Sequence, residues 1–314
     1  MTAAVPPGFR SGFACLVGRP NVGKSTLLNA MVGQKVAITS DRPQTTRRVL
    51  RGVVHRSDSQ LVLVDTPGVH RPRTLLGERL NDLTRDAVAE VDVVTLCLPA
   101  DAAVGPGDRR LAEQVAAAGS RRRRPGVVVA VTRLDLVGRE AGARALLAAQ
   151  ELARGAGLDV AGYVPTSGTT GEGVDVLVDV LLGLLPEGPP YFGADQVHDA
   201  DVDTLVAELV REAALDGVRD ELPHSIAVVT EEIVPREGRP DGDPLTDVRV
   251  HLVVERESQK GIVIGRGGVR LREVGTQARR GIEGVLGTRV HLDVRVKVAR
   301  DWQRDPRSLD RLGF

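Results

Sequence analysis

A short motif close to the start of the chain restricts its fold more than any other feature. The eight residues GRPNVGKS, Gly18 to Ser25, directly follow the apolar run FACLV. Gly-x-x-x-x-Gly-Lys-Ser between a strand and a helix is the pattern of a phosphate-binding loop, whose glycines let backbone N–H groups surround a phosphate. Lys24 brings a charge to the β- and γ-phosphates, Ser25 offers a hydroxyl to Mg²⁺, and the helix that begins here adds its positive end. A glycine-rich turn without a ligand is the alternative. The nucleotide-contacting candidates of the motif are Gly18, Asn21, Val22, Gly23, Lys24, Ser25 and Thr26.

Length and composition restrict the class of protein that carries this motif. Because single cores stop growing at roughly 250 to 300 residues, a chain of 314 residues favours two domains. The chain is 42% apolar and 27% charged, and it has no apolar run long enough to span a bilayer. Its N-terminus lacks the apolar core of a secretory signal, and both cysteines, Cys15 and Cys97, lie in strand-like apolar runs. We therefore expect a globular protein of the reducing cytoplasm with buried free thiols.

The domain organisation follows from changes in pattern and charge. Up to Leu185, apolar runs such as QLVLVDT and GVVVAVT alternate with amphipathic segments, which predicts a mainly parallel sheet with helices on both faces. A proline- and glycine-rich stretch follows, and then the order helix, strand, strand, helix, strand. Residues 191–250 carry 5 Lys and Arg against 15 Asp and Glu, whereas residues 251–314 carry 14 against 8, as expected when one end meets a polyanion. We predict an α/β domain over 1–185, a linker over 186–203 and an α+β domain with a C-terminal helix over 204–314.

Two segments downstream of the loop are expected to contact the metal and the γ-phosphate. The run LVLVDTPG ends a buried strand with Asp65, which can hold Mg²⁺ through a water, and with Gly68, whose N–H can reach a γ-phosphate. Before it, the polar segment DRPQTTRR offers Thr45 and Thr46 as a second hydroxyl ligand of the metal, and we favour Thr46. The predicted Mg²⁺ ligands are Ser25, Thr46 and Asp65. The nucleotide-contacting candidates of the second segment are Asp65, Thr66, Pro67 and Gly68.

Two loops after later strands are expected to recognise the base. Ligands of open α/β sheets bind at the carboxyl ends of the strands, where TRLD, Thr132 to Asp135, follows GVVVAV. The Asp135 carboxylate accepts from the N1–H and amino group of guanine, whereas adenine presents an acceptor at N1. The loop TSGTTGEG adds the backbone of Ser167 and Gly168 for the guanine O6. Each loop alone is equally well an ordinary connection, but together they predict GTP over ATP. The base-contacting candidates are Thr132, Arg133, Asp135, Ser167 and Gly168.

In order and spacing, GRPNVGKST, PQTTR, DTPGVH and the serine-glycine loop resemble the motifs of the Era family, in the TrmE and Era branch of the Ras-like P-loop NTPases. The resemblance implies a Ras-like fold and Mg²⁺-dependent GTP hydrolysis. One motif departs, because Thr132-Arg133 stands where the family has Asn-Lys. Thr132 lacks the amide that ties the base loop to the phosphate loop, so we expect that tie to be lost and affinity to be weaker. The stem of Arg133 can still lie over the guanine plane.

The catalytic candidates are Asn21, Lys24, Thr46 and Gly68. Phosphoryl transfer needs positioning and charge neutralisation, but the residue after Gly68 is Val69, which cannot orient water, so intrinsic turnover should be slow. The resemblance implies that Asn21 helps to hold a K⁺ that takes over part of an arginine finger's role. Two alternatives stay open: Asn21 only braces the loop, or Arg47 and Arg48 act instead, although we expect both arginines to be solvated.

A second glycine-rich turn, Gly265-Arg266-Gly267-Gly268, lies between an apolar strand or turn and an amphipathic helix. A Gly-x-x-Gly turn at a helix start lets a nucleic-acid backbone approach closely, which is how KH domains clamp about four single-stranded nucleotides. Only 2% of the chain is aromatic, so stacking on an aromatic platform is not expected. A tight turn without RNA is the alternative. The predicted RNA contacts are Lys260, Gly265, Arg266, Gly267, Gly268, Arg270, Arg272 and Lys297.

The segments LPHSIAVV, VERESQKGIVIGRGG and RDWQRDPRSLDRLG resemble the C-terminal type II KH domain of the Era family. The resemblance implies binding near the 3′ end of 16S ribosomal RNA, a role in maturation of the 30S subunit, and some peripheral association with the inner face of the cell membrane. We expect a monomer that binds no DNA, in which nucleotide reorders the switch segments Gln44–Arg48 and Val69–Leu76. The alternatives are an RNA-binding scaffold that hardly hydrolyses GTP, and an ATP-driven motor that binds DNA.

Overall fold

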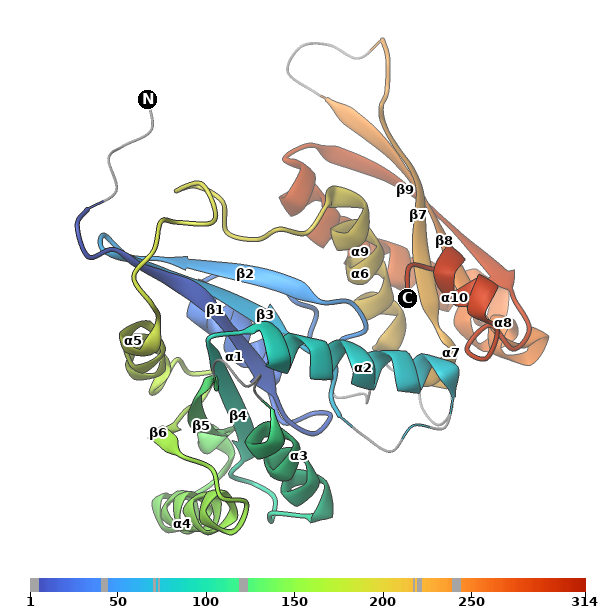
Figure 1. Cartoon of the computed structure of the whole chain (residues 1–314). Coiled ribbons are helices and arrows are strands. Elements are labelled where there is room, and N and C mark those ends of the chain that lie inside the picture. Colours follow the sequence, from blue (N-terminus) through green and yellow to red (C-terminus); the bar gives the residue numbers. More distant parts are fainter. Residues whose placement is uncertain are drawn as a thin grey trace. The chain divides into compact units, whose positions relative to one another are not determined.

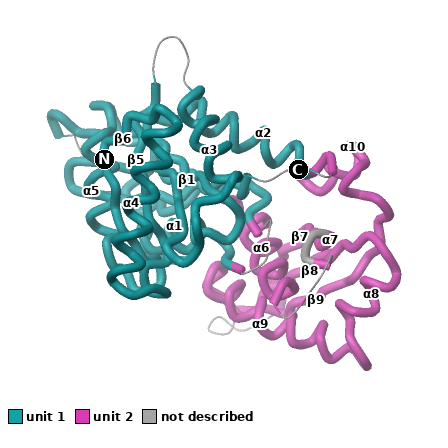
Figure 2. Tube along the Cα trace, turned by 90° about the horizontal axis from the view of Figure 1, so that it is seen from below, with its two compact units in different colours: residues 1–39, 46–72, 77–199 teal, residues 40–45, 73–76, 200–314 magenta. Residues whose placement is uncertain are grey.

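The chain forms two compact units, distinguished by colour in Figure 2. The computed structural model describes residues 6–40, 45–69, 72, 74–118, 124–216, 218, 222–238 and 244–314, with the backbone alone at 223 and 224 (Figure 1). Unit 1 comprises Met1–Thr39, Thr46–Pro72 and Gly77–Asp199, and unit 2 comprises Ser40–Thr45, Arg73–Leu76 and Ala200–Phe314. The two segments expected to switch with nucleotide are therefore divided between the units. Gln44 and three residues of the second switch segment, His70, Arg71 and Arg73, lie outside the described residues.

Unit 1 is built on a six-stranded sheet in the order β2-β3-β1-β4-β5-β6. Each neighbouring pair is parallel except β2 with β3, which is antiparallel. The strands β1, β3, β4 and β5 are almost wholly buried, as their apolar runs predicted. The predicted mainly parallel α/β fold is confirmed. The strands are β1 (Arg10–Val17), β2 (Leu50–His55), β3 (Ser59–Asp65), β4 (Val93–Pro99), β5 (Gly126–Thr132) and β6 (Val160–Pro165).

Helices cover both faces of this sheet. On one face, Cys15 and Val17 of β1 share a core cluster with Leu111 and Val115 of α3, to which α2 and α4 also contribute. On the other face, α1 and α5 pack on β1, β3 and β5. The sheet is therefore buried from both sides, which fixes its carboxyl-end loops as the place for a site. The helices are α1 (Lys24–Val32), α2 (Leu75–Glu90), α3 (Pro106–Ala117), α4 (Arg139–Gly155) and α5 (Val174–Leu184), with a 3₁₀ turn η1 (Leu134–Leu136).

The proline-rich residues 186–199, the strap, are held against unit 1 by specific hydrogen bonds. The buried amide of Gln60 in β3 accepts from the N–H groups of Tyr191 and Phe192 at 2.7 and 3.0 Å, and donates to the Phe192 carbonyl at 2.9 Å. The strap is grouped with unit 1 up to Asp199. The backbone of the strap forms further hydrogen bonds with unit 1, among them Gly188 N–H to the Phe9 carbonyl at 2.9 Å and Val53 N–H to the Val197 carbonyl at 2.9 Å. The linker bounds 186–203 stay a prediction.

Unit 2 packs helices on a three-stranded sheet in the order β7-β8-β9, in which β7 and β8 are antiparallel and β8 and β9 parallel. Its core joins α6 and α9 to the inward residues of the strands, such as Val250 and Leu252 of β8. The predicted small α+β domain is confirmed. Its elements are α6 (Val202–Leu215), α7 (Leu222–Ser225), β7 (Ala227–Pro235), β8 (Leu245–Val254), α8 (Glu257–Ile264), a 3₁₀ turn η2 (Arg266–Gly268), α9 (Val269–Leu286), β9 (Arg289–Val298) and α10 (Pro306–Arg311).

The apolar run before the second glycine-rich turn is helical, so the expectation of a strand or turn there was wrong. Residues 261–264 form the end of α8, which begins at Glu257. The side chain of Gln259 accepts from the N–H groups of Glu255 and Arg256 at 2.9 and 3.0 Å, which satisfies donors at the helix start. Four apolar residues cannot by themselves distinguish a strand from the last turn of a helix.

The end of the chain is anchored within unit 2. Trp302 is fully buried, and its indole N–H donates to the Ser225 carbonyl at 3.2 Å. Its ring stacks on Phe314 with centroids 5.7 Å apart. No helix in the described ranges combines the length and the apolar character needed to cross a membrane.

Candidate nucleotide and RNA sites

The phosphate loop connects β1 to α1 and adopts left-handed backbone angles at two positions. Asn21 has φ of 60° and Gly23 has φ of 90°. A Cβ atom on Gly18 would lie 2.8 Å from the carbonyl oxygen of Cys97, so this position requires glycine for space. The loop therefore needs its glycines for two different reasons, backbone angle at Gly23 and close approach to β4 at Gly18.

Lys24 is buried at the start of α1, where its ammonium donates to the carbonyls of Gly18 at 3.3 Å and Arg19 at 3.1 Å. Burial lowers the pKa of Lys24, while the nearby Asp65 carboxylate opposes that shift. Burial also raises the pKa of the Cys97 thiol to about 12, so this cysteine is an uncharged neighbour. The lysine is thus held in the cradle of the loop, where a phosphate would meet it.

The three predicted metal ligands lie together at the ends of α1 and β3. The Ser25 hydroxyl donates to Asp65 Oδ2 at 2.8 Å, the Thr46 hydroxyl donates to the same oxygen at 3.0 Å, and the two hydroxyl oxygens are 3.0 Å apart. Thr45 is directed elsewhere, because its hydroxyl donates to the Ser40 carbonyl at 3.4 Å. Oxygen donors of this kind suit the hard cation Mg²⁺. The donor set therefore fits the expected metal, with Thr46 rather than Thr45 in reach.

The DTPG segment packs on the phosphate loop. A Cβ atom on Gly68 would lie 2.7 Å from the Cα of Pro20, and the Val69 N–H donates to the Gly18 carbonyl at 3.3 Å. Thr66 donates its hydroxyl to the Leu16 carbonyl at 2.6 Å. Contact with the phosphate loop therefore requires glycine at position 68. Pro67 follows Thr66, and its carbonyl accepts from Thr84 of α2, a contact that sequence reasoning missed.

The two base loops also meet. The buried Ser167 donates its hydroxyl to Asp135 Oδ1 at 2.6 Å, while Asp135 itself is exposed in η1. A Cβ atom on Gly168 would lie 2.9 Å from the backbone of Thr26, so the second loop lies against the start of α1. The structure thus brings Asp135, Ser167 and Gly168 to the same end of the sheet as the phosphate loop.

The expectation that Thr132 loses the tie between the base loop and the phosphate loop was wrong. Its hydroxyl donates to the Val22 carbonyl at 2.6 Å and lies 3.3 Å from the Leu98 carbonyl. Arg133 adds a second tie, because its guanidinium donates to the Asn21 carbonyl at 3.2 Å and pairs with Asp101 at 3.3 Å. A hydroxyl can replace an amide here because only one donor is needed.

Of the residues considered for charge neutralisation, Arg47 departs from expectation. It is 1% exposed, so the expectation of a solvated residue was wrong. Arg48 is half-buried. Asn21 is exposed at the tip of the loop, and its backbone carbonyl accepts from Arg133.

The second glycine-rich turn joins α8 to α9 with positive φ at three glycines, 72° at Gly265, 61° at Gly267 and 75° at Gly268. Side chains with more than a hydrogen are disfavoured at such angles, which explains the glycines. Arg266 is exposed at the tip. Arg272 folds back on the turn, donating to the carbonyls of Gly267 at 2.9 Å and Gly268 at 3.3 Å.

The remaining basic candidates have different surroundings. Arg270 donates to the carbonyls of Ala214 and Asp216 and so caps α6. Lys260 is half-buried in α8. Lys297 is exposed on β9, with its ammonium 3.1 Å from Nδ1 of His251. Sequence reasoning treated these cations as equivalent, whereas the guanidinium groups of Arg270 and Arg272 already donate to backbone carbonyls within the fold.

Comparison with known proteins accounts for both units. Residues 13–133 match the family model described as 50S ribosome-binding GTPase, and residues 221–303 match the KH domain model. GTPase Era of Mycobacterium sp. strain KMS is 61% identical over 98% of this chain and 99% of its own, and GTPase Era of Mycobacterium tuberculosis strain H37Ra is 60% identical over the same shares.

Solved structures agree. Era in complex with MgGDPNP and nucleotides 1506–1542 of 16S ribosomal RNA matches 97% of this chain and 99% of its own, with a TM-score of 0.88 and 34% identity. An Era variant from Aquifex aeolicus bound to GDP and AlF₄⁻ matches with the same values. The identities and coverage lead to one conclusion: this chain is a member of the Era family of GTPases.

Proposed function

We propose that this GTPase hydrolyses GTP with Mg²⁺ held by Ser25, Thr46 and Asp65, Asp65 acting through a water. The observation that carries the proposal is that their oxygens are joined pairwise at 2.8 to 3.0 Å. Bound Mg²⁺ would neutralise charge on the β- and γ-phosphates, and a solved relative holds MgGDPNP. Lys24 adds a second positive charge, and the Gly68 N–H orients the γ-phosphate. Because Val69 cannot orient water, intrinsic turnover is slow.

Nucleotide selection is assigned to the two base loops. The Ser167 hydroxyl holds Asp135 at 2.6 Å, which supports a fixed carboxylate for the N1–H and amino group of guanine. Thr132 and Arg133 tie that loop to the phosphate loop. Competition of labelled GDP against GTP and ATP tests the assignment, and equal displacement by ATP would contradict the role of Asp135. The proposed nucleotide contacts are Gly18, Asn21, Val22, Gly23, Lys24, Ser25, Thr26, Asp65, Thr66, Pro67, Gly68, Thr132, Arg133, Asp135, Ser167 and Gly168.

The metal assignment is tested by a pair of neighbouring threonines. Thr46→Ala removes a proposed ligand and should abolish Mg²⁺-dependent phosphate release while GDP still binds. Thr45→Ala removes a hydroxyl that is directed to the Ser40 carbonyl rather than to Asp65, so it should retain most activity. Equal phosphate release by the two variants would contradict the choice of Thr46.

We further propose that Asn21 helps to hold a K⁺ during hydrolysis. The exposed position of Asn21 at the tip of the phosphate loop supports access to an ion beside the phosphates. Phosphate release measured with K⁺ and with Na⁺ at equal ionic strength should be faster with K⁺, and Asn21→Ala should remove that difference. A rate that ignores K⁺ would leave Asn21 as a brace of the loop.

We propose that the KH domain binds 16S ribosomal RNA near its 3′ end and that the protein acts in maturation of the 30S subunit. A relative that matches 97% of this chain was solved with nucleotides 1506–1542 of that RNA. The exposed turn with its positively charged tip supports a backbone clamp, because it offers N–H groups and no bulky side chain. The proposed contacts are Lys260, Gly265, Arg266, Gly267, Gly268, Arg270, Arg272 and Lys297.

The RNA proposal is tested with changes in the turn. Replacing Arg266 and Gly267 with Asp should abolish binding to a single-stranded 3′ segment of 16S RNA while GTP binding is retained. Arg307→Asp, in α10, makes a charge change outside the proposed contacts and is the control. Unchanged RNA affinity in the turn variant would contradict the clamp, and competition by duplex DNA would contradict the expectation that no DNA is bound.

The coupling between nucleotide and RNA is assigned to the switch segments. Ser40–Thr45 and Arg73–Leu76 are grouped with unit 2, whereas Thr46 and Val69 are grouped with unit 1. This division supports a mechanism in which γ-phosphate and Mg²⁺ order the segments and thereby change RNA affinity. We retain the domain assignment 1–185, 186–203 and 204–314 for this mechanism. RNA affinity that is equal with GDP and with a GTP analogue would contradict it.

A scaffold that binds guanine nucleotide with little hydrolysis is the second candidate, favoured by the apolar Val69. Phosphate release with and without K⁺ and RNA decides, because no release under any condition would favour the scaffold. We also propose a cytoplasmic monomer with peripheral association at the inner face of the membrane. Sedimentation of the pure protein and fractionation of cells test these two assignments.

A further inference from the structure

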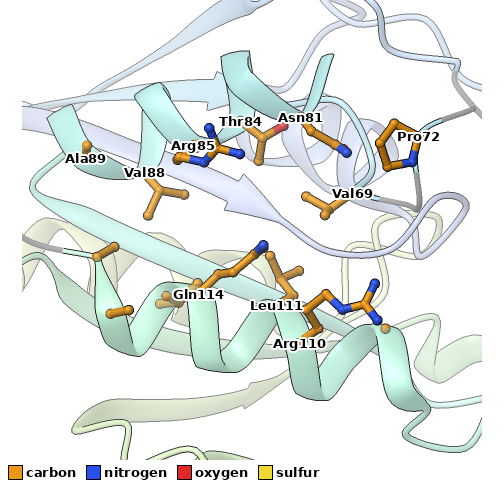
Figure 3. A pocket seen from close by; sticks show the side chains of 14 residues that line it. Val69, Pro72, Asn81, Thr84, Arg85, Val88, Ala89, Arg110, Leu111 and Gln114 are labelled. Carbon is orange, nitrogen blue, oxygen red and sulfur yellow. The ribbon is translucent and has the colours of Figure 1, made fainter. Parts of the chain in front are cut away.

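A cavity between α2 and α3 is separate from the proposed nucleotide and RNA contacts. Its volume is about 460 Å³, within the roughly 300 to 1,000 Å³ typical of small-molecule sites. Figure 3 shows Val88 from α2 and Leu111 from α3 extending into the space between the two helices, with Val69 and Pro72 at one end. Much of the wall is apolar, so the cavity can bury the body of an organic molecule.

The polar groups of the wall are cationic or neutral. The lining includes Arg85, Arg110, Asn81, Thr84 and Gln114 and no Asp or Glu. Arg85 pairs with the exposed Asp82 at 2.8 Å through one nitrogen. In the described part of the chain, the side chains of Arg110 and Gln114 have no hydrogen-bond or ion-pair partner. Two guanidinium groups without a carboxylate in the wall favour an anionic ligand.

On the α2 side, one cavity residue donates a hydrogen bond to the segment Asp65 to Val69, which is proposed to contact the γ-phosphate, and another belongs to that segment. Thr84 is 2% exposed, and its hydroxyl donates to the Pro67 carbonyl at 3.1 Å. Val69 lines the cavity with its side chain, and its N–H donates to the Gly18 carbonyl at 3.3 Å. A ligand that contacts Val69 therefore acts on a residue whose backbone is bonded to the phosphate loop.

The other side is joined to the phosphate loop itself. Arg19, within that loop, pairs with the buried Asp108 of α3 at 2.7 Å. Gly107 lines the cavity, and a Cβ atom on it would lie 3.1 Å from Arg19 Cδ. Both helices that form the cavity thus contact the nucleotide site through named hydrogen bonds or ion pairs.

We propose that this cavity is a regulatory binding site for a small organic anion with an apolar body. Its acidic group binds Arg110 and Arg85 with help from Gln114, and its body packs on Val69, Val88 and Leu111. Binding favours one arrangement of the segment that contains Gly68 and Val69, and so changes the affinity for nucleotide. Because such coupling is reciprocal, the nucleotide state changes the affinity for the anion by the same factor.

The test uses 8-anilinonaphthalene-1-sulfonate, whose fluorescence rises on burial, with its uncharged counterpart N-phenyl-1-naphthylamine. We expect the sulfonate to bind the folded, full-length protein with one-to-one stoichiometry, and the uncharged compound to bind about tenfold more weakly because it forms no charge-assisted hydrogen bond. Arg110→Gln should weaken sulfonate binding by a similar factor. Arg109→Gln, the same change on an exposed neighbour outside the lining, should not.

A second pair of variants fixes the location. Ala89→Phe fills the cavity from α2 and should abolish sulfonate binding, whereas Glu90→Phe, one residue outside the lining, should retain it. Sulfonate binding that is unchanged by Arg110→Gln and Ala89→Phe would place the dye elsewhere and overturn the proposal. Equal binding of the uncharged compound would favour a groove for apolar side chains of a partner and overturn the anion assignment.

The regulatory part is measured separately, by sulfonate affinity with GDP and with a non-hydrolysable GTP analogue. A difference of severalfold between the two states supports coupling to the nucleotide site, and equal affinity would overturn it. The measurements of the cavity and of its coupling to nucleotide both use sulfonate binding and require neither GTP hydrolysis nor RNA. A failure of the site is therefore distinguishable from a failure of GTP hydrolysis or RNA binding.

Discussion

At the scale of single residues, the hydroxyl of Thr132 joins segments that are 110 positions apart in the chain. The residue is buried at the end of β5, and its hydroxyl lies 2.6 Å from the Val22 carbonyl in the phosphate loop. A buried carbonyl that loses its donor bears a desolvation cost of about 1 to 3 kcal/mol. This single bond therefore contributes to both stability and the position of the base loop.

We expect Thr132→Val, which keeps the shape and removes the hydroxyl, to lower the free energy of unfolding by about 1 to 3 kcal/mol. GDP affinity should fall as well, because the base loop and phosphate loop lose a tie. Thr95→Val in β4 is the matched control, since among the described residues the buried Thr95 hydroxyl has no hydrogen-bond partner. Urea unfolding and labelled-GDP titration measure both effects. Equal stability of the two variants would show that the Val22 contact has no net effect.

At the scale of elements, the arginines around the RNA turn have different tasks. Arg266 is exposed at the tip, whereas Arg272 donates to two carbonyls of the turn itself. Turn carbonyls that point into a guanidinium fix the backbone angles that the three glycines permit. Arg272 is therefore expected to order the turn, and Arg266 to meet phosphate.

This division predicts different salt dependence for two alanine variants. Arg266→Ala should weaken RNA binding and reduce the slope of log affinity against log salt by about 1, because one phosphate contact is lost. Arg272→Ala should weaken binding with a smaller change of slope, since its main loss is the order of the turn. Titration of a 16S 3′ fragment at several salt concentrations measures both slopes. Identical slopes in the two variants would contradict the assignment.

The phosphate loop and the second glycine-rich turn show how much of the site could be predicted from the sequence. The glycines of both turns were predictable from a local pattern, and so were the helices α1 and α9 that follow them, whereas the helix α8 before the second turn was not. The proximity of Ser25 and Asp65 was predictable, because they follow the parallel strands β1 and β3, which end at one edge. Thr46 precedes β2, which runs antiparallel to β3 and so begins at that same edge. The capping of α6 by Arg270 was not, because it depends on which carbonyls from a distant segment come within reach. The hydroxyl tie of Thr132 was missed for the same reason.

The outer face of β8 carries a group whose protonation affects unit 2. His251 is 12% exposed, with Glu231 3.1 Å from its Nε2 and Lys297 3.1 Å from its Nδ1. Burial lowers the pKa of His251, Lys297 and Arg295 lower it further, and Glu231 and Asp293 oppose the shift. Because the folded state then binds fewer protons than the unfolded state, this group's contribution to stability is complete above the unfolded pKa of about 6.5 and is lost as pH falls through the folded pKa.

We expect the free energy of unfolding of unit 2 to fall as the pH drops below about 6.5, and this dependence to be smaller in His251→Gln. Denaturant unfolding at a series of pH values measures it. The exposed His291→Gln, which lies beside Asp247 on the same face, is the control. A pH dependence that survives in His251→Gln would assign the titration to another group.

At the scale of the whole molecule, the two units have separate cores, and each switch segment has some residues grouped with unit 1 and others with unit 2. Nucleotide contacts are proposed in unit 1 alone, so a bound nucleotide stabilises unit 1 directly by mass action, about 2.7 kcal/mol at a ligand concentration 100 times Kd. In the mechanism proposed above, the effect on unit 2 passes through the switch residues that are grouped with it. The molecule offers a local reporter, since its single tryptophan, Trp302, is buried in unit 2.

Thermal unfolding followed by Trp302 fluorescence therefore measures communication between the units. We expect a non-hydrolysable GTP analogue with Mg²⁺ to raise the unfolding midpoint seen by Trp302 more than GDP does, because in the proposed mechanism the γ-phosphate orders segments that are grouped with unit 2. The unfolding midpoint measured by far-UV circular dichroism, which reports on both units, should rise with either nucleotide. In Thr46→Ala the analogue should lose its advantage over GDP at the tryptophan. If nucleotide leaves the midpoint of Trp302 fluorescence unchanged while it raises the circular dichroism midpoint, the two units unfold independently. That outcome would contradict the proposal that GTP changes RNA affinity through the switch segments.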